Sequence, residues 1–253
     1  MRYLVSIAYD GSKYNGYQKQ VQGNTIQDKL EEVLTTINDK KHVSVSASGR
    51  TDSGVHALNQ KAHFDLKIKI TPDSLKKAMN SLLPKDIYVR DCVSVSDDFH
   101  ARFDVKAKEY IYKINMGEYD PISKDYIFQY CKKLDVVEME RALKYLEGTH
   151  DFKSFTSGDD VRDDYVRTII QTNLIRDLKN VNMITISFLG TGFMRYMVRN
   201  LVGTLIQIGE GKYKSTDIID ILEAHDRRKA GMCADACGLY LKDVFYKIGR
   251  AHV

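Results

Sequence analysis

The chain has few cysteines, and they lie far apart. Four occur among 253 residues, at positions 92, 131, 233 and 237. This number and spacing exclude the dense disulfide framework of a small secreted domain, so we expect reduced thiols. Cys233 and Cys237 form a CxxxC pair, but no second cysteine pair or nearby His-x-x-x-His completes four ligands, and we predict no metal site.

Long hydrophobic runs are also missing. No apolar stretch approaches the length of a membrane span. The chain does not open with a charged leader and an apolar core, because residues 1–9 already alternate in the manner of a strand. We therefore expect a soluble, cytoplasmic protein with no membrane association.

Charge of one sign is not in large excess. The formal net charge is +4 and the isoelectric point is about 8.7. Such a mild excess permits a surface that binds a polyanion but does not require one. Apolar residues make up 43% of the chain, which suffices for a core in one large domain or two ordinary ones.

Hydrophobic period and capping signals predict six elements in the first hundred residues. Strands are expected at 3–9, 43–47, 61–66 and 87–95, and helices after the caps Thr25 and Thr71. Thr25 with Asp28 resembles a capping box, and Pro72 suits a first helical turn. The order βαββαβ is that of ferredoxin-like folds and of RNA-recognition modules.

The remainder repeats this order. Strands are expected at 109–116, 168–175, 183–188 and 239–247, and helices at 135–148, 193–208 and 216–224. We predict an α+β protein of two ferredoxin-like (RRM-like) lobes, residues 1–104 and 105–253, with a cleft between two antiparallel sheets. The long connections 10–24 and 151–166 are candidate substrate loops, with disorder as the alternative.

The most informative segment is Ser48–Ala57, which reads Ser-Gly-Arg-Thr-Asp-Ser-Gly-Val-His-Ala. Gly49 and Gly54 allow backbone angles closed to other residues and a close approach to a ligand. Arg50 could contact a phosphate and Asp52 could act chemically. The alternative is a surface turn whose side chains bond their own backbone, as most Asp-Ser-Gly stretches do.

Tyr110 and Arg199 belong to the second lobe. Tyr110 lies on an alternating strand, and this pattern by itself favours a role in sheet packing. On the predicted helix 193–208, Arg195 and Arg199 share a stripe edged by apolar residues, which indicates partial burial. We favour a functional role for Arg199 and leave Arg195 open.

Several ordered motifs together resemble the tRNA pseudouridine synthase A (TruA-type) family along essentially the whole chain. They are Tyr9-Asp10-Gly11-Ser12-Lys13-Tyr14 with Gly16 and Gln18, Gly49 to Ala57, Asn80 with Leu83-Pro84, Asp98 to Phe103, Tyr110-Ile111-Tyr112, Met197 to Gly203 and Gly238 to Leu241. So many blocks in one order do not arise by chance.

The resemblance implies a homodimeric, cofactor-free isomerase that binds tRNA in the central cleft. Its reaction converts uridine to pseudouridine at nucleotides 38 to 40 of the anticodon arm. Asp52 would be the nucleophile, Tyr110 would stack on the target uracil and help remove its C5 proton, and Arg199 would pair with Asp52. Whether the carboxylate attacks the base, attacks the sugar or takes a sugar proton stays open.

The resemblance also implies substrate contacts. Arg50 would help evict the base or hold its phosphate, with a turn salt bridge as the alternative. Lys13, His100, Arg102 and Leu239 are the other expected substrate-binding residues, although Lys13 could be merely solvated and His100 and Arg102 could tie the lobes together. We expect His56 to be a structural hydrogen-bonding residue.

Two departures from the family pattern leave the target nucleotides open. The chain has no tryptophan, and Tyr17 stands where the family usually has one; no proline precedes Gly238. A divergent paralogue with another RNA target, a non-catalytic RNA-binding protein and a metal-dependent hydrolase using Asp10, Asp52 and His56 are the alternatives.

Overall fold

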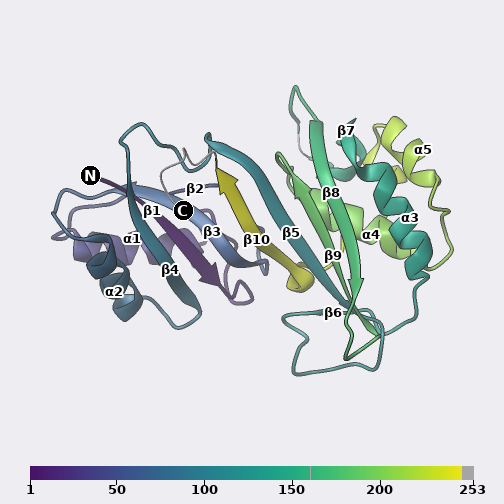
Figure 1. Ribbon diagram of the computed structural model, residues 1–253, viewed down its shortest axis with the longest axis horizontal. Coiled ribbons are helices and arrows are strands. Elements are labelled where there is room, and N and C mark those ends of the chain that lie inside the picture. Colours follow the sequence, from purple (N-terminus) through teal and green to yellow (C-terminus); the bar gives the residue numbers. More distant parts are fainter. Residues whose placement is uncertain (160, 247–253) are drawn as a thin grey trace. The chain divides into compact units, whose positions relative to one another are not determined.

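The computed structural model describes residues 1–159 and 161–246, and over these ranges the chain forms ten strands and five α-helices (Figure 1). The predicted α+β class is confirmed. The end of the last expected strand, Lys247, lies outside the described residues. Within the described residues, none of the helices combines the length and the apolar character that a membrane span needs.

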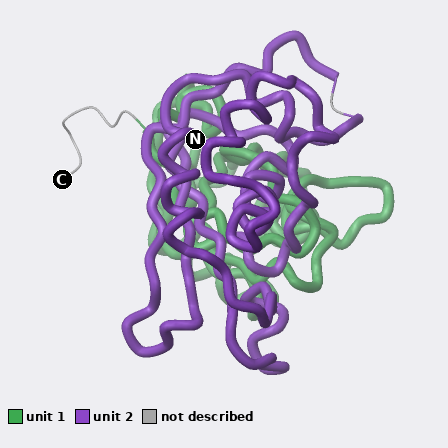
Figure 2. Tube along the Cα trace, turned by 90° about the vertical axis from the view of Figure 1, so that its right-hand side faces the viewer, with its two compact units in different colours: residues 1–106, 240–253 green, residues 107–239 purple. Residues whose placement is uncertain are grey.

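The chain divides into two compact units, coloured separately in Figure 2. Unit 1 contains residues 1–106 together with the chain from Tyr240 onward, and unit 2 contains residues 107–239. The first boundary lies two residues from the expected one. The last strand, however, groups with unit 1 and not with the second lobe, so unit 1 is discontinuous in sequence.

Unit 1 is a sheet with two helices packed against it. Its elements are β1 (Arg2–Tyr9), α1 (Ile26–Ile37), β2 (Ser46–Ala47), β3 (His56–Asp65), α2 (Pro72–Leu82), β4 (Ile87–Val95) and most of β10 (Leu239–Tyr246). Strand β1 lies between β4 and β3 and is antiparallel to both. Strand β3 also pairs with β2 in antiparallel fashion and with β10 in parallel fashion.

Both expected helix starts in unit 1 are confirmed. Thr25 and Asp28 form the capping box, since the Thr25 side chain accepts from the Asp28 backbone and the Asp28 side chain accepts from the Thr25 backbone. Thr71 caps α2 by accepting from Ser74, and Pro72 occupies the first turn. These local contacts involve neighbours in sequence, which is why the sequence predicts them.

Strands β2 and β3 differ from their predicted ranges. The N–H of Val45 donates to the Glu31 side chain at 3.1 Å, so this residue satisfies its backbone without a strand partner, and β2 shrinks to two residues. Strand β3 begins at His56, five residues before its expected start. His56 and Ala57 pair with Tyr240 and Leu241 of β10, and Ala57 also pairs with Tyr9 of β1. A partner from the far end of the chain is invisible to local patterns.

Unit 2 contains paired strands with helices packed beside them. Its strands are β5 (Val105–Asn115), β6 (Phe128–Gln129), β7 (Gly148–Asp151), β8 (Val166–Arg176) and β9 (Met183–Gly190). Its helices are α3 (Val136–Leu146), α4 (Met197–Gly209) and α5 (Asp217–Glu223), with 3₁₀ turns η1 (Lys153–Phe155), η2 (Arg227–Lys229) and η3 (Ala236–Gly238). The sheet order is β5-β9-β8-β7, all antiparallel neighbours, with β6 parallel to β5.

Helix α4 begins later than the sequence predicts. Tyr196 has a left-handed backbone (φ 61°), so the helix starts at Met197 and not at 193. Arg195 therefore lies before the helix, and the predicted stripe shared by Arg195 and Arg199 is wrong. Arg199 is half-buried as expected, whereas Arg195 is exposed.

Candidate active site

The segment Ser48–Ala57 is a loop whose start and end are both anchored to β3. Ser48 donates through its backbone to Lys61 and through its hydroxyl to Gln60 Oε1, at 2.8 and 2.5 Å. The amide of the buried Gln60 then donates to the carbonyl of Gly49 at 3.0 Å. We call residues 48–55 the Asp52 loop. Its first two residues have a fixed backbone.

Asp52 opens a tight turn within this loop. The N–H of Val55 donates to the carbonyl of Asp52 at 3.2 Å, and Gly54 has a φ of +78° at the third position of the turn. That angle suits glycine, so the sequence requirement for Gly54 is conformational. The Asp52 side chain is half-buried and Arg50 is exposed, with its Nε donating to Gln18 Oε1 at 3.2 Å.

The long connection 10–24 packs under the Asp52 loop. Tyr17 N–H donates to the carbonyl of Thr51 at 3.1 Å, and the Ser53 hydroxyl donates to the carbonyl of Tyr14 at 3.1 Å. Gly16 lies so close that a Cβ there would be 2.7 Å from the Thr51 carbonyl oxygen. The connection therefore supports both residues that flank Asp52.

His56 is a buried anchor where the loop enters β3. It is 1% exposed, its Nδ1 accepts from the Gly11 N–H at 3.1 Å and lies 3.2 Å from Asp10 Oδ1, and its ring stacks on Tyr240 at 4.6 Å. A Cβ at Gly11 would lie 2.0 Å from the Val55 carbonyl oxygen, so only glycine permits this approach. These contacts give His56 a structural place in the fold.

The candidates of the long connection differ in exposure. Lys13 is exposed. Tyr14 is 5% exposed and donates to Asp86 at 2.6 Å; burial and this carboxylate raise the pKa of its hydroxyl. Lys19 pairs with Glu31 at 3.3 Å. Tyr14 and Lys19 therefore make contacts within the protein, although Lys19, like Lys13, is exposed to solvent.

His100 and Arg102 belong to the turn that follows β4. His100 Nδ1 accepts from the backbone N–H groups of Arg102 and Phe103 at 3.1 and 3.4 Å, which fixes the turn. The Arg102 guanidinium is exposed and lies 5.9 Å from the centre of the Phe103 ring. His100 thus organises the backbone, and Arg102 presents a charge.

In unit 2, Tyr110 lies on β5 with its ring largely buried. It is 8% exposed, is paired in register with Phe188 of β9, and meets the Phe193 ring edge to face at 5.1 Å. Two aromatic neighbours fix the orientation of this ring. Such a held ring can serve as a stacking surface for a base.

Arg199 is held in the first turn of α4. Its Nε donates to the carbonyl of Ala234 at 2.7 Å, and its guanidinium lies 5.1 Å from the centre of the Tyr196 ring. The N–H of Ala234 in turn donates to the Arg199 carbonyl at 3.1 Å. The side chain is thus oriented by the segment that crosses α4.

That crossing depends on residues to which the sequence analysis gave no role. A Cβ at Gly203 would lie 1.6 Å from the Met232 carbonyl oxygen, so this position of α4 must be glycine. Asn200 is 1% exposed, donates to the carbonyls of Phe155 and Thr156, and accepts from Arg227. Both residues lie in the Met197 to Gly203 motif, and this motif was the sequence signal that could have pointed to them.

Leu239 follows Gly238, which is a second position where the backbone lies very close to another part of the protein. A Cβ at Gly238 would lie 2.8 Å from the Tyr112 ring, whose hydroxyl donates to the carbonyl of Asp235 at 2.7 Å. Leu239 itself is 5% exposed. Its side chain belongs to the packed interior, and it does not offer an open surface.

The expected site residues divide between the units. Unit 1 contains Asp52 and the expected substrate contacts Lys13, Arg50, His100 and Arg102, whereas unit 2 contains Tyr110, Arg199 and Leu239. Within the described residues there is no group of three or more His, Cys, Asp or Glu side chains that could hold a metal ion. All four cysteines are free.

Comparison with known proteins gives one family. The sequence matches the model of a family described as tRNA pseudouridine synthase over residues 5–104 and 142–247. Among curated proteins it is 42% identical to tRNA pseudouridine synthase A of Geobacillus sp. (strain WCH70), covering 97% of this chain and 98% of that one. Those of Latilactobacillus sakei and Lacticaseibacillus casei are 41% and 44% identical, over 97% and 96% of this chain and 99% of each relative.

Proposed function

The chain belongs to the tRNA pseudouridine synthase family, and from this premise we propose that it modifies the anticodon stem-loop of tRNA with Asp52 as nucleophile. It is an isomerase that converts uridine to pseudouridine in tRNA. The observation that carries the assignment is identity of 41 to 44% over nearly the full length of enzymes with this name.

The chemistry needs little beyond a placed carboxylate. The glycosidic bond from C1′ to N1 of uracil breaks, the base turns, and a bond from C1′ to C5 forms while the C5 proton is lost and N1 gains one. No electrons enter or leave and no net water is consumed. A covalent intermediate with Asp52 would divide this step into two easier ones. The anchored backbone at Gly49, Thr51 and Val55 supports a fixed position for this carboxylate.

We propose that Tyr110 stacks on the extruded uracil and takes part in removal of the C5 proton. A base inside a stem must be flipped out, and an aromatic face repays part of the lost stacking. Arg199 is proposed to pair with Asp52, and its anchoring by Ala234 and Tyr196 supports a fixed guanidinium.

The proposed substrate contacts fall into two kinds. Lys13, Arg50 and Arg102 are exposed cations suited to phosphates. His100 and Leu239 are proposed to act through the turn and the strand that they hold.

We further propose ferredoxin-like lobes that contribute to an RNA-binding cleft, and a homodimeric, cytoplasmic enzyme that needs no cofactor. The order β4-β1-β3-β2 with antiparallel neighbours supports the first lobe. In unit 2, the elements β5, α3, β8, β9 and α4 follow one another in the order of the first five elements of that pattern, which supports the second, although the last strand, β10, groups with unit 1. A tRNA substrate supports the location.

The test is direct detection of product. An unmodified tRNA transcript is incubated with the protein in excess EDTA after magnesium folding, digested to nucleosides, derivatised to mark pseudouridine and measured by mass spectrometry. We expect product with the wild type and none with Asp52→Asn, which should keep tRNA binding within a few fold, because phosphate contacts supply most of the affinity. Product from Asp52→Asn at the wild-type rate would remove Asp52 from its role. Binding of tRNA by the wild-type protein without any product would favour a non-catalytic RNA-binding protein.

A further inference from the structure

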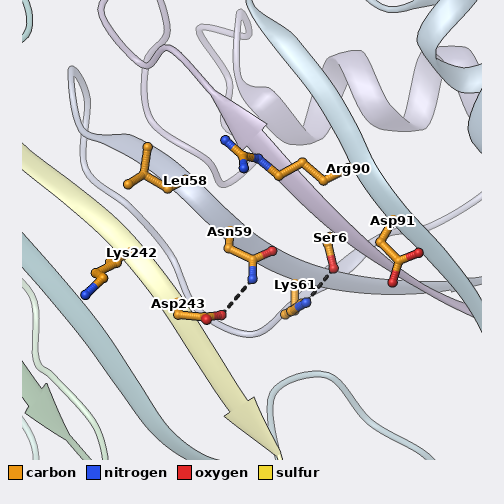
Figure 3. Close-up of a pocket in the computed structure, with 8 residues that line it drawn as sticks. All are labelled: Ser6, Leu58, Asn59, Lys61, Arg90, Asp91, Lys242 and Asp243. Carbon is orange, nitrogen blue, oxygen red and sulfur yellow. Dashed lines mark hydrogen bonds between the residues drawn. The ribbon is translucent and has the colours of Figure 1, made fainter. Parts of the chain in front are cut away.

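The sheet of unit 1 carries a charged pocket that the proposed catalytic residues do not use (Figure 3). Its volume is about 470 Å³, and its lining comes from four strands: Ser6, Leu58, Asn59, Lys61, Arg90, Asp91, Lys242 and Asp243. We call it the sheet-face pocket. It contains three cations and two carboxylates.

The pocket lies on the sheet face that the helices leave uncovered. On β1, Tyr3, Val5 and Ile7 are fully buried and point into the core under α1 and α2. Side chains alternate along a strand, so Ser6 points to the other face. Lys61 and Asp91 are the register partners of Ser6 on either side, so the three side chains lie in one row across the sheet.

Two strand irregularities bring extra side chains to this face. The partners of Ser6 and Ile7 on β4 are Asp91 and Val89, so Arg90 is an inserted residue. Similarly, the partners of Ile7 and Tyr9 on β3 are Gln60 and Ala57, which leaves Leu58 and Asn59 opposite Ala8. Bulges of this kind redirect side chains and are frequent beside functional sites.

The charged groups of the pocket differ in the hydrogen bonds and ion pairs that they already make within the protein. Lys61 donates to the Ser6 hydroxyl, and burial lowers the pKa of its ammonium group. Asp243 accepts from Asn59 and from its own following backbone N–H, both at 2.7 Å. Arg90 is exposed, and its guanidinium group makes neither a hydrogen bond nor an ion pair with the described residues. A guanidinium with five donors is therefore available to a ligand.

We propose that the sheet-face pocket holds a backbone phosphodiester of the RNA substrate, with Arg90 as its main contact and Lys61 and Lys242 beside it. The proposal rests on the proposed function. Arginine binds a phosphate through two parallel hydrogen bonds. The carboxylates fit RNA as well, because each phosphate is flanked by a ribose whose 2′-hydroxyl can donate to Asp243.

The distance of the sheet-face pocket from the Asp52 loop along β3 indicates which phosphate of the RNA it would bind. The strand leaves the Asp52 loop at His56, and Leu58 to Lys61 lie roughly 7 to 17 Å further along at about 3.3 Å per residue. The phosphate in the pocket therefore belongs to a nucleotide near the flipped one in the chain but not to the flipped nucleotide itself.

The first test compares two single-charge variants. Arg90→Gln removes the guanidinium, whereas Lys77→Gln removes an exposed charge of α2 that has no place in the pocket. With a synthetic anticodon stem-loop, Arg90→Gln should raise KM about tenfold with kcat within about twofold, and Lys77→Gln should leave both within about twofold. Arg90→Lys should fall between, since it keeps the charge without the fork. Equal effects of Arg90→Gln and Lys77→Gln would overturn the proposal.

The second test identifies the phosphate. Stem-loops with one neutral methylphosphonate at each backbone position in turn are bound to the Asp52→Asn protein with and without Arg90→Gln. One position close to the target uridine should weaken binding with Arg90 present and lose this effect in Arg90→Gln. If every position behaves alike in both proteins, the pocket holds no phosphate. Absence of pseudouridine with the wild-type protein would instead reject the proposed function, and the binding cycle would still report on the pocket.

Discussion

At the residue scale, Tyr17 carries a buried hydroxyl for which the described residues offer no hydrogen-bond partner. The side chain is 1% exposed, and its ring lies 6.3 Å from that of Tyr9. Tyr9 differs because its hydroxyl bonds Thr51 at 2.8 Å, although burial raises its pKa to about 12. Two neighbouring tyrosines thus differ in whether the hydroxyl is satisfied.

We expect opposite effects when each hydroxyl is removed. Tyr17→Phe should leave the free energy of unfolding unchanged or raise it by up to about 1 kcal/mol, because an unpaired buried polar group is costly. Tyr9→Phe should lower it by about 1 kcal/mol, because the Thr51 hydroxyl loses its partner. Urea unfolding of both variants checks this. A larger loss for Tyr17→Phe than for Tyr9→Phe would show that the Tyr17 hydroxyl does have a partner.

Tyr196 offers a residue-scale test of activity. Its ring lies against the guanidinium groups of both Arg199 and Arg195, and Arg195 also donates to its hydroxyl at 3.0 Å. If the ring orients Arg199, Tyr196→Ala should lower kcat about tenfold with little change in KM, and Tyr196→Phe should restore most of the rate. Single-turnover rates with tRNA measure this. Equal losses in the two variants would assign the role to the hydroxyl and its Arg195 contact.

At the scale of elements, close packing against α4 depends on glycine. The segment that supplies Ala234 to Arg199 crosses the helix at Gly203. Gly231 on that segment also lies close to the backbone of α4, because a Cβ added at Gly231 would be 2.6 Å from the Thr204 backbone nitrogen. Two glycines facing one another let the backbones meet directly.

Gly203→Ala should therefore destabilise the protein by about 3 kcal/mol or more, since backbone and not a flexible side chain stands in the way. Gly158→Ala is the matched control, because nothing lies within 4 Å of a Cβ there, and it should change stability by less than about 0.5 kcal/mol. Thermal unfolding compares the two. Similar melting temperatures would mean that the crossing can move away from α4.

The ends of β1 and β3 are joined by an ion pair with a predictable pH dependence. Arg2 donates to both carboxylate oxygens of Asp65, at 3.0 and 2.7 Å, and also to the carbonyls of Asp97 and Phe99. The hydrogen bond from Arg2 holds the pKa of Asp65 below its ordinary value of 3.8.

A folded-state pKa below the unfolded one stabilises the fold above the unfolded pKa, and this contribution is lost as pH falls through the folded pKa. Asp65→Asn should therefore be less stable than the wild type at pH 7, and the difference should shrink below about pH 4. The effect should be small, because Asp65 is 56% exposed. Urea unfolding at pH 7, 5 and 3 checks it. A difference that grows toward low pH would contradict the ion pair.

At the scale of the whole molecule, the last strand completes the first unit. Leu241 of β10 is fully buried and pairs with Ala57 of β3, beside the Asp52 loop. Leu201 of α4 is equally buried but belongs to unit 2. The two leucines allow the boundaries of the units to be tested.

Leu241→Ala should cost about 2 to 5 kcal/mol and should increase amide hydrogen exchange in β1, β3 and β4. Leu201→Ala should increase exchange within residues 107–239 instead. Exchange measured by mass spectrometry on peptides distinguishes the patterns. Faster exchange mainly within residues 107–239 in Leu241→Ala would restore the last strand to the second lobe.

The sequence alone determined what depends on near neighbours and on motif order. The caps at Thr25 and Thr71, the alternation of β4 and the Gly-bracketed loop around Asp52 depend on contacts within a few residues. The ordered motifs identified the family. Tertiary structure decided the rest. The early start of β3 needed β10, the delayed start of α4 needed a left-handed Tyr196, and the sheet-face pocket needed two bulges against β1. Each of these depends on which distant segments pair, and local hydrophobic period carries no record of that choice.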